Sequence, residues 1–161
     1  MAGNGKHRKK PQPAHVIMFI QTHKFEAEAI AVRTGVPAEV ILAQSALESD
    51  WGRAVHNNAY FGVKGKSPTG NSTAFTTHEY TAQGKVKTQA TFRAYTGFSE
   101  SAEDYASLIR RRYARALAHK EDPVKFAQVI AEQGYATDPA YGKKLASIIH
   151  GHVVPVIGKR P

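Results

Sequence analysis

The strongest constraint in this sequence is a single change in the spacing of its apolar residues. Before about residue 50 and after about residue 98, apolar side chains recur every three or four positions, as an amphipathic helix requires. Between Ala74 and Tyr95 they alternate with polar residues, and Gln83-Gly84 interrupts the alternation. This pattern predicts one antiparallel hairpin between helical segments. We therefore expect an α+β domain that is mainly helical, with the hairpin inserted as a lobe.

Capping residues and helix breakers delimit the expected helices. Proline suits the first turn of a helix, and glycine suits the left-handed residue just after its end. Ser101-x-x-Asp104 has the form of a capping box. These signals predict helices over roughly 16–32 with a stop at Gly35, over 37–49, from Ser101 onward, from Asp122-Pro123 to Gly134, and from Asp138-Pro139 to near Gly151.

The chain divides by composition into three expected segments. These are a basic disordered arm over residues 1–14, a folded domain over 15–152 and a C-terminal tail over 153–161. The apolar run Val16–Ile20 is too short for the core of a signal peptide or for a membrane span. We therefore expect no membrane insertion, and any action outside the cytoplasm would need another delivery route.

The charge and the residue types limit the classes of partner and chemistry. A formal net charge of +9 implies a polyanionic partner, such as nucleic acid, a bacterial envelope or an anionic membrane surface. The absence of cysteine excludes disulfides, thiol nucleophiles and cysteine-bound zinc. His150-x-His152 lacks a third ligand at a recognisable spacing, and no glycine-rich phosphate loop follows a strand. We expect neither a metal nor a cofactor.

Glu48 is the candidate catalytic acid. Hydrolysis of a glycosidic bond needs a protonated carboxyl beside the leaving oxygen and usually a second carboxylate. Glu48 falls in the last turn of the second expected helix, where the negative end of the helix dipole disfavours ionisation, and adjacent Trp51 would add desolvation. By position alone, a solvated helix glutamate is the commoner case.

Seven short segments in a fixed order change that balance. In Ala43–Gly52 the helix-ending Glu48 is followed, after Ser49 and Asp50, by Trp-Gly. The other six are Asn58–Lys64, Thr77–Tyr80, Phe92–Tyr95, Ser101–Tyr105, Arg112-Tyr113 and Gly134–Tyr141. Together they resemble glycoside hydrolase family 73, the endo-β-N-acetylglucosaminidases of bacterial cell walls, which include the muralytic domain of flagellar rod-assembly proteins. The resemblance covers about residues 33–150.

The resemblance implies a lysozyme-like fold and a set of functional residues. Glu48 corresponds to the general acid, Glu79 on the hairpin to a second carboxylate that activates water, and Tyr135 to a functional tyrosine. Core packing is an equally good account of Tyr135 and the better account of Phe61. The candidate substrate-binding residues are Trp51, Asn58, Tyr60, Phe61, Lys64 and Tyr141.

The sequence departs from the family pattern at two positions. Asp50 stands where glycine is usual, and Ala59 stands where leucine is usual. A carboxylate at Asp50 either raises the pKa of Glu48 further or points to solvent. The distance between Glu48 and Glu79 decides between inversion, retention and a substrate-assisted mechanism, and the sequence leaves these open.

The expected function is hydrolysis of the glycan strand of peptidoglycan at the GlcNAc–MurNAc β-1,4 linkage, by a bacteriolytic monomer. A muramidase, a lytic transglycosylase and a catalytically silent wall-binding or assembly module are the alternatives. A nucleic-acid partner is disfavoured, because much of the positive charge lies in the N-terminal arm and one helix.

The biological setting has two candidates. One is an antibacterial toxin delivered by a secretion system and blocked by a cognate immunity protein. The other is a phage lysin released through a holin. We favour the toxin, and both settings place the activity in the periplasm or cell wall.

Overall fold

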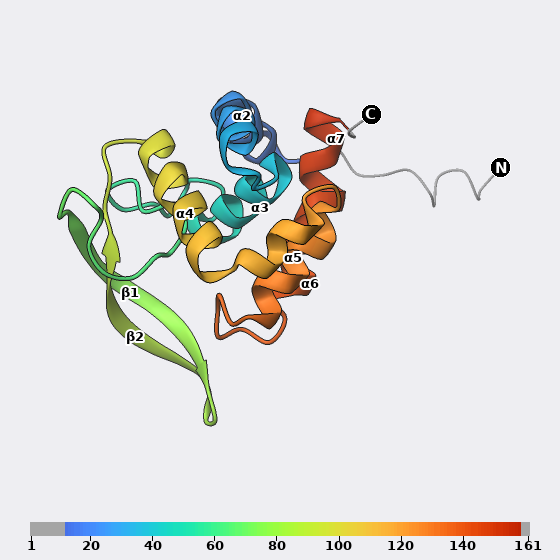
Figure 1. The fold of residues 1–161 in the computed structure, drawn as a ribbon. Helices are drawn as coiled ribbons and strands as arrows, with labels where there is room; N and C mark the ends of the chain where they lie inside the picture. Colours follow the sequence, from blue (N-terminus) through green and yellow to red (C-terminus); the bar gives the residue numbers. More distant parts are fainter. Residues whose placement is uncertain (1–11, 159–161) are drawn as a thin grey trace.

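The computed structural model describes residues 12–158 as a helical body from which a single hairpin projects (Figure 1). The expected α+β architecture is confirmed. The basic arm expected over residues 1–14 lies almost wholly outside the described residues. The helices are α2 (Ala14–Thr34), α3 (Ala38–Ser49), α4 (Phe98–Arg112), α5 (Pro123–Glu132), α6 (Tyr141–Ile148) and α7 (Val154–Ile157); η1 (Ala114–His119) is a 3₁₀ helix, η2 (Ile149–Val153) is a π turn, and the strands are β1 (Ser72–Thr81) and β2 (Gly84–Arg93).

Helix α3 forms the centre of the body. Every residue from Ala38 to Ala46 is buried, and α2, α5, α6 and η2 pack around the helix. Its one buried amide, Gln44, accepts a hydrogen bond from the Tyr105 hydroxyl and donates to the Tyr141 hydroxyl at 3.2 Å. A buried polar group with both partners present fixes its helix without a desolvation penalty. Hydrogen bonds thereby link α3 to α4 and α6, and the last turn of α3 places Glu48 at the surface of the body.

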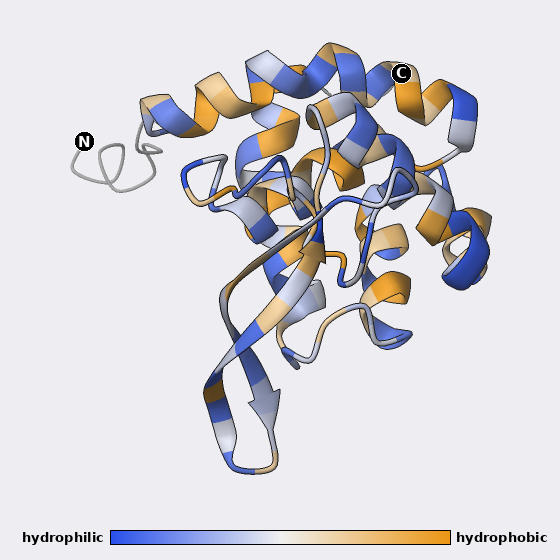
Figure 2. Cartoon of the chain, turned by 90° about the vertical axis from the view of Figure 1, so that its left-hand side faces the viewer, coloured by the Kyte–Doolittle hydropathy of each residue, from blue (hydrophilic) through white to orange (hydrophobic). Residues whose placement is uncertain are grey.

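The hairpin is a regular antiparallel pair with a two-residue turn between Thr81 and Gly84. Its far half is largely hydrophilic, whereas apolar residues gather in the helical body (Figure 2). The Phe75 and Phe92 rings stack at 4.3 Å. Because an isolated two-stranded hairpin is only marginally stable in water, contacts with the body must hold it in place.

Two helix boundaries follow the sequence signals directly. Gly35 ends α2 in the left-handed conformation at φ 82°, and Asp122 caps α5 by accepting a hydrogen bond from the Lys125 N–H at 3.1 Å. The expected hairpin is confirmed, but its turn is Ala82-Gln83, one residue earlier than expected, because Gly84 already pairs with Thr81. Among residues 12–158, no helix combines the length and apolar character needed to cross a bilayer.

The capping box expected at Ser101 is wrong. Helix α4 begins three residues earlier at Phe98, whose ring is buried in the core, so Ser101 and Asp104 lie inside the helix. The N-cap is Gly97, which has no side-chain cap, and Glu100 Oε1 accepts the Thr96 N–H just before the helix at 2.8 Å. Burial of Phe98 thus decides where the helix starts, and Asp104 is free to pair with Arg93 at 3.0 Å.

The last helices also differ from expectation. Helix α6 begins at Tyr141, two residues after the expected first helical residue Pro139, because the Asp138 carboxylate accepts the Ala140 N–H at 2.8 Å in a turn that precedes the helix. Gly151 does not end the helical run, since it lies inside the π turn η2. Residues 153–157, expected in the C-terminal tail, are helical and pack against α2, with Val153 buried.

Candidate active site

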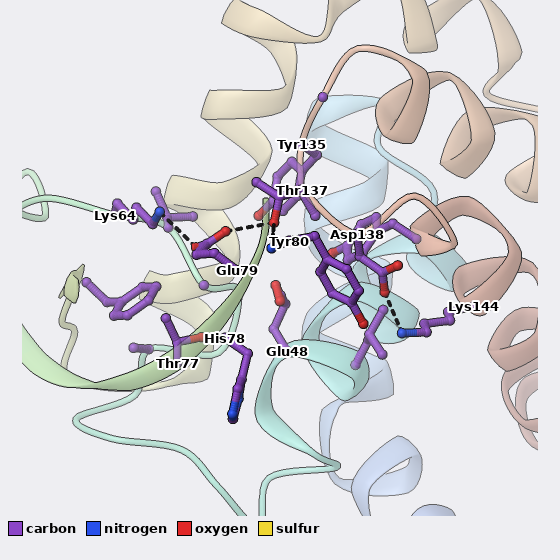
Figure 3. Close-up of a pocket in the computed structure, with 18 of the residues that line it drawn as sticks. Glu48, Lys64, Thr77, His78, Glu79, Tyr80, Tyr135, Thr137, Asp138 and Lys144 are labelled. Carbon is purple, nitrogen blue, oxygen red and sulfur yellow. Dashed lines mark hydrogen bonds and ion pairs between the residues drawn. The ribbon is translucent and has the colours of Figure 1, made fainter. Parts of the chain in front are cut away.

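A cleft of about 580 Å³ lies between the hairpin and the helical body. Its walls come from the end of α3, the loop over residues 59–64, both strands, the end of α4 and the segment over residues 134–144. Figure 3 shows Glu48 pointing from the end of α3 into this cleft, with Glu79 reaching in from the hairpin. The fold therefore gathers residues from five distant parts of the chain around two carboxyl groups.

Glu48 lies partly buried at the end of α3, with its carboxyl against the backbone of Gly62. A Cβ atom on Gly62 would lie 2.8 Å from Glu48 Oε2, so only glycine leaves room for the carboxyl. Burial, followed by the negative charge of Glu79, raises the pKa of Glu48 from 4.5 to about 7. Glu48 therefore holds a proton near neutral pH, as a general acid must.

Asp50 does not perturb Glu48. It is exposed, and its carboxylate pairs with Arg53 at 2.8 Å. Asp50 is the left-handed residue that ends α3, with φ 48°. Aspartate adopts this conformation more readily than most residues, so its backbone suits the end of the helix. Of the two roles considered for Asp50, pointing to solvent is the one observed.

Glu79 has the opposite electrostatic environment. Its Oε1 pairs with Lys64 Nζ at 2.9 Å, and its Oε2 accepts the Thr137 hydroxyl at 2.7 Å. These two hydrogen bonds, Lys64 first, lower the pKa of Glu79 below 4.5. Two carboxyls that line one cleft with pKa values displaced in opposite directions can serve as an acid and a base at the same pH.

Tyr135 lines the cleft, and its hydroxyl donates to the Phe61 carbonyl at 2.8 Å. Its ring stacks on Tyr141 at 5.9 Å. Burial raises the pKa of both phenols well above 10. Tyr135 therefore remains a neutral phenol that anchors the loop leading to Gly62. Tyr141 also borders the cleft but is 4% exposed.

Four of the predicted substrate-binding residues do not line the cleft. Phe61 is stacked on Tyr105 at 4.2 Å and is 2% exposed, so the core interpretation of Phe61 is confirmed. The Asn58 amide donates to the Tyr95 carbonyl at 3.1 Å and joins two loops. The other two, Trp51 and Tyr60, pack against aromatic rings of the body.

Trp51 and Tyr60 both contact Phe19. The Trp51 ring meets Phe19 edge-on at 5.9 Å and His152 at 5.4 Å, and the Tyr60 ring lies 6.4 Å from Phe19 and 5.0 Å from Phe98. The structure therefore gathers Glu48, Lys64, Glu79, Tyr135 and Tyr141 around the cleft, whereas the side chains of the other four residues pack outside its lining.

Sequence reasoning missed two residues of the site. Gly62 makes room for the Glu48 carboxyl, and Thr137 holds Glu79. Both stand inside motif segments that the sequence displays, but their contacts depend on how distant segments fold together. Within residues 12–158, no three His, Asp or Glu side chains cluster as metal ligands would.

Known proteins resemble this chain over most of its length. A family model named Glucosaminidase, described as mannosyl-glycoprotein endo-beta-N-acetylglucosaminidase, matches residues 24–152. The peptidoglycan hydrolase FlgJ of Pseudomonas aeruginosa is 38% identical over 153 residues, which cover 88% of this chain and 38% of that protein. The chain spans less than half the length of the curated FlgJ relatives that it matches.

Two solved structures give the spatial comparison. A peptidoglycan hydrolase mutant from Sphingomonas sp. A1 superposes with a TM-score of 0.77 at 34% identity, covering 86% of this chain and 96% of that one. A type VI secretion system effector–immunity complex from Pseudomonas protegens gives a TM-score of 0.62 at 23% identity, covering 88% and 95%, which shows a shared fold only. The expected lysozyme-like fold is confirmed. The family model and the curated relatives together show that this chain belongs to the glucosaminidase family, glycoside hydrolase family 73.

Proposed function

We propose that this domain hydrolyses the β-1,4 linkage between N-acetylglucosamine and N-acetylmuramic acid in the glycan strand of peptidoglycan. The observation that carries the proposal is the pair Glu48 and Glu79, which line one cleft with pKa values displaced in opposite directions. Family membership supports the substrate class.

In the proposed reaction, Glu48 acts as the general acid. It transfers its proton to the glycosidic oxygen as the bond to the anomeric carbon breaks, which yields a neutral leaving alcohol. Glu79 takes a proton from the water that attacks the anomeric carbon. One water is consumed, and the products are a new reducing end and a new free hydroxyl. The Lys64 and Thr137 contacts keep Glu79 ionised before this step.

The remaining candidate residues receive different roles. We propose that Tyr135 and Lys64 shape the cleft wall that faces the sugar, since both line it. The packing of Trp51, Asn58, Tyr60 and Phe61 favours a structural role for each. The basic side chains along the cleft suit the carboxylates of stem peptides on the glycan; they are Lys64, Lys85, Arg93, Arg112 and Lys144.

Product analysis tests the reaction and the bond together. Purified peptidoglycan is digested with wild type and with Glu48→Gln, the products are reduced with borohydride, and their ends are identified by mass spectrometry. We expect fragments ending in reduced N-acetylglucosamine from wild type and none from the variant. A reduced muramic end would identify a muramidase, and an anhydro end a transglycosylase. If the folded wild-type protein releases no glycan fragments, the domain would be a binding module and not a hydrolase.

We further propose that the protein acts on the cell wall of other bacteria as an antibacterial toxin, neutralised by an immunity protein that covers the cleft. The shared fold shows only that this architecture can serve in an effector that binds an immunity partner. The test is expression in the periplasm of a host cell. Lysis by wild type but not by Glu48→Gln, with protection by a co-expressed neighbouring gene, is expected. Lysis that no neighbouring gene prevents would contradict the immunity partner.

A further inference from the structure

The hydroxyl of Thr137 links the hairpin to the helical body. It donates to Glu79 Oε2 at 2.7 Å and accepts the Tyr80 N–H at 3.0 Å (Figure 3). Thr137 lies in the segment between α5 and α6, far along the chain from the hairpin. One side chain therefore contacts both the carboxylate of Glu79 and the backbone of the following residue.

The contact lies at the end of the hairpin that has least support of its own. Glu79 pairs with Val86, only two residue pairs from the turn, whereas the Phe75 and Phe92 rings stack farther along the strands. Near the turn, support comes from the segment that contains Thr137. Thr137 makes two hydrogen bonds to the hairpin, and in the following helix α6 the ammonium of Lys144 lies 6.0 Å from the Tyr80 ring centroid. These interactions set where the far end of the hairpin stands over the cleft.

Lys64 and Thr137 hold Glu79 in different ways. Lys64 pairs with Oε1 and supplies a positive charge, but its own side chain is 59% exposed, so solvent weakens the ion pair. Thr137 holds Oε2 and, through the Tyr80 N–H, the strand itself. A hydroxyl has one proton to donate, and here it goes to the carboxylate, so its lone pairs remain for the Tyr80 N–H. Both contacts stabilise the negative charge of Glu79, and Thr137 in addition fixes the position of its carboxylate relative to the body.

We infer that Thr137 is a positioning residue for the reaction, which fixes the Glu79 carboxylate over the cleft and ties the hairpin to the body. This inference rests on the proposed function. Valine at this position keeps the shape of threonine but can neither donate nor accept. Serine keeps the hydroxyl and loses only a methyl group.

The test compares Thr137→Val with Thr137→Ser, using Thr76→Val on the exposed side of β1 as the control. The values of kcat and KM on soluble peptidoglycan fragments are measured as a function of pH. We expect Thr137→Val to lower kcat by about 10- to 100-fold with a smaller change in KM, as loss of alignment does. The acidic limb of its kcat profile moves to higher pH. Thr137→Ser and Thr76→Val stay within about threefold of wild type.

Two outcomes would overturn the inference. One is a Thr137→Val enzyme with the kcat and acidic limb of wild type. The other is a Thr137→Ser enzyme as impaired as Thr137→Val, which would show that the methyl group and not the hydroxyl matters.

Hydrogen exchange separates this inference from the proposed function. The Tyr80 amide is expected to exchange at least about tenfold faster in Thr137→Val than in wild type, because it loses its hydrogen-bond acceptor. That result needs no activity, so it supports the tie between hairpin and body even if wild type cleaves no peptidoglycan. An unchanged exchange rate at Tyr80 would contradict the tie.

Discussion

The carboxyl of Glu48 lies against Gly62 so closely that no side chain fits between them. A Cβ atom at Gly62 would meet Oε2 at 2.8 Å and the carboxyl carbon at 3.1 Å. Gly62 also has φ 63°, a left-handed conformation that other residues adopt at a cost. The loop that ends in Lys64 therefore places both carboxyls, Glu48 by contact with Gly62 and Glu79 by the ion pair with Lys64.

We predict that Gly62→Ala abolishes most of the activity because the added methyl group displaces the Glu48 carboxyl. The matched control is Gly70→Ala, since Gly70 is also left-handed at φ 86° and no atom lies within 4 Å of the place that its added methyl group would occupy. Each variant should lose about 1 kcal/mol of stability from the strained backbone. Only Gly62→Ala should lose tenfold or more in kcat/KM. Equal activity of the two variants would refute a steric role for Gly62.

Activity should follow a bell-shaped pH profile set by the two carboxyls. It falls as pH rises through about 7, where Glu48 loses its proton, and as pH falls below 4.5, where Glu79 gains one. In Glu79→Gln, the basic limb of the residual activity should move to lower pH, because the charge that helps to raise the pKa of Glu48 is gone. A basic limb that stays at about 7 in this variant would contradict the coupling.

Glu48→Gln should be more stable than wild type at pH 8 but not at pH 4. Folding raises the Glu48 pKa above its unfolded value of 4.5, so its favourable contribution is complete below pH 4.5 and is lost as pH rises through about 7. The shift corresponds to at most about 3 kcal/mol. Urea unfolding of both proteins at pH 4 and at pH 8 measures the difference in their free energies of unfolding. Equal stability differences at both pH values would show that Glu48 is not perturbed.

Asp50→Asn should leave the pH profile of kcat unchanged. The Asp50 carboxylate is exposed and paired with Arg53, and asparagine also tolerates the left-handed conformation at the end of α3. A basic limb displaced by 0.5 pH unit or more, roughly 0.7 kcal/mol, would show that Asp50 does act on Glu48.

The sequence predicts those features that depend on local spacing. The hairpin follows from alternation over a few residues, and Glu48 is placed in the last turn of α3 by helical period. Glu79 falls near the turn for the same reason. Errors arise where tertiary burial competes with a local signal, as when Phe98 starts α4 ahead of the apparent capping box at Ser101.

Contacts between distant segments could not be predicted in this way. Apolar spacing does not say whether an aromatic ring in the loop after α3 faces sugar or core, so Trp51 and Tyr60 remained candidates for sugar binding although both pack against Phe19. Nor does it show that the segment containing Thr137 returns to the hairpin. The first kind of contact depends on how the loop packs on the helical body, and the second on how the hairpin docks there; no local pattern records either.

Glu48 is a protonated acid near neutral pH, in the same cleft as an ionised Glu79. The most direct measurement is a carbon-13 NMR titration of the glutamate side-chain carboxyls in wild type, with Glu48→Gln and Glu79→Gln to assign the two signals. We predict one carboxyl that titrates at about 7 and is missing from Glu48→Gln, and a second, missing from Glu79→Gln, that titrates below 4.5. If the Glu48 signal titrates at or below 4.5, the account of this site is contradicted.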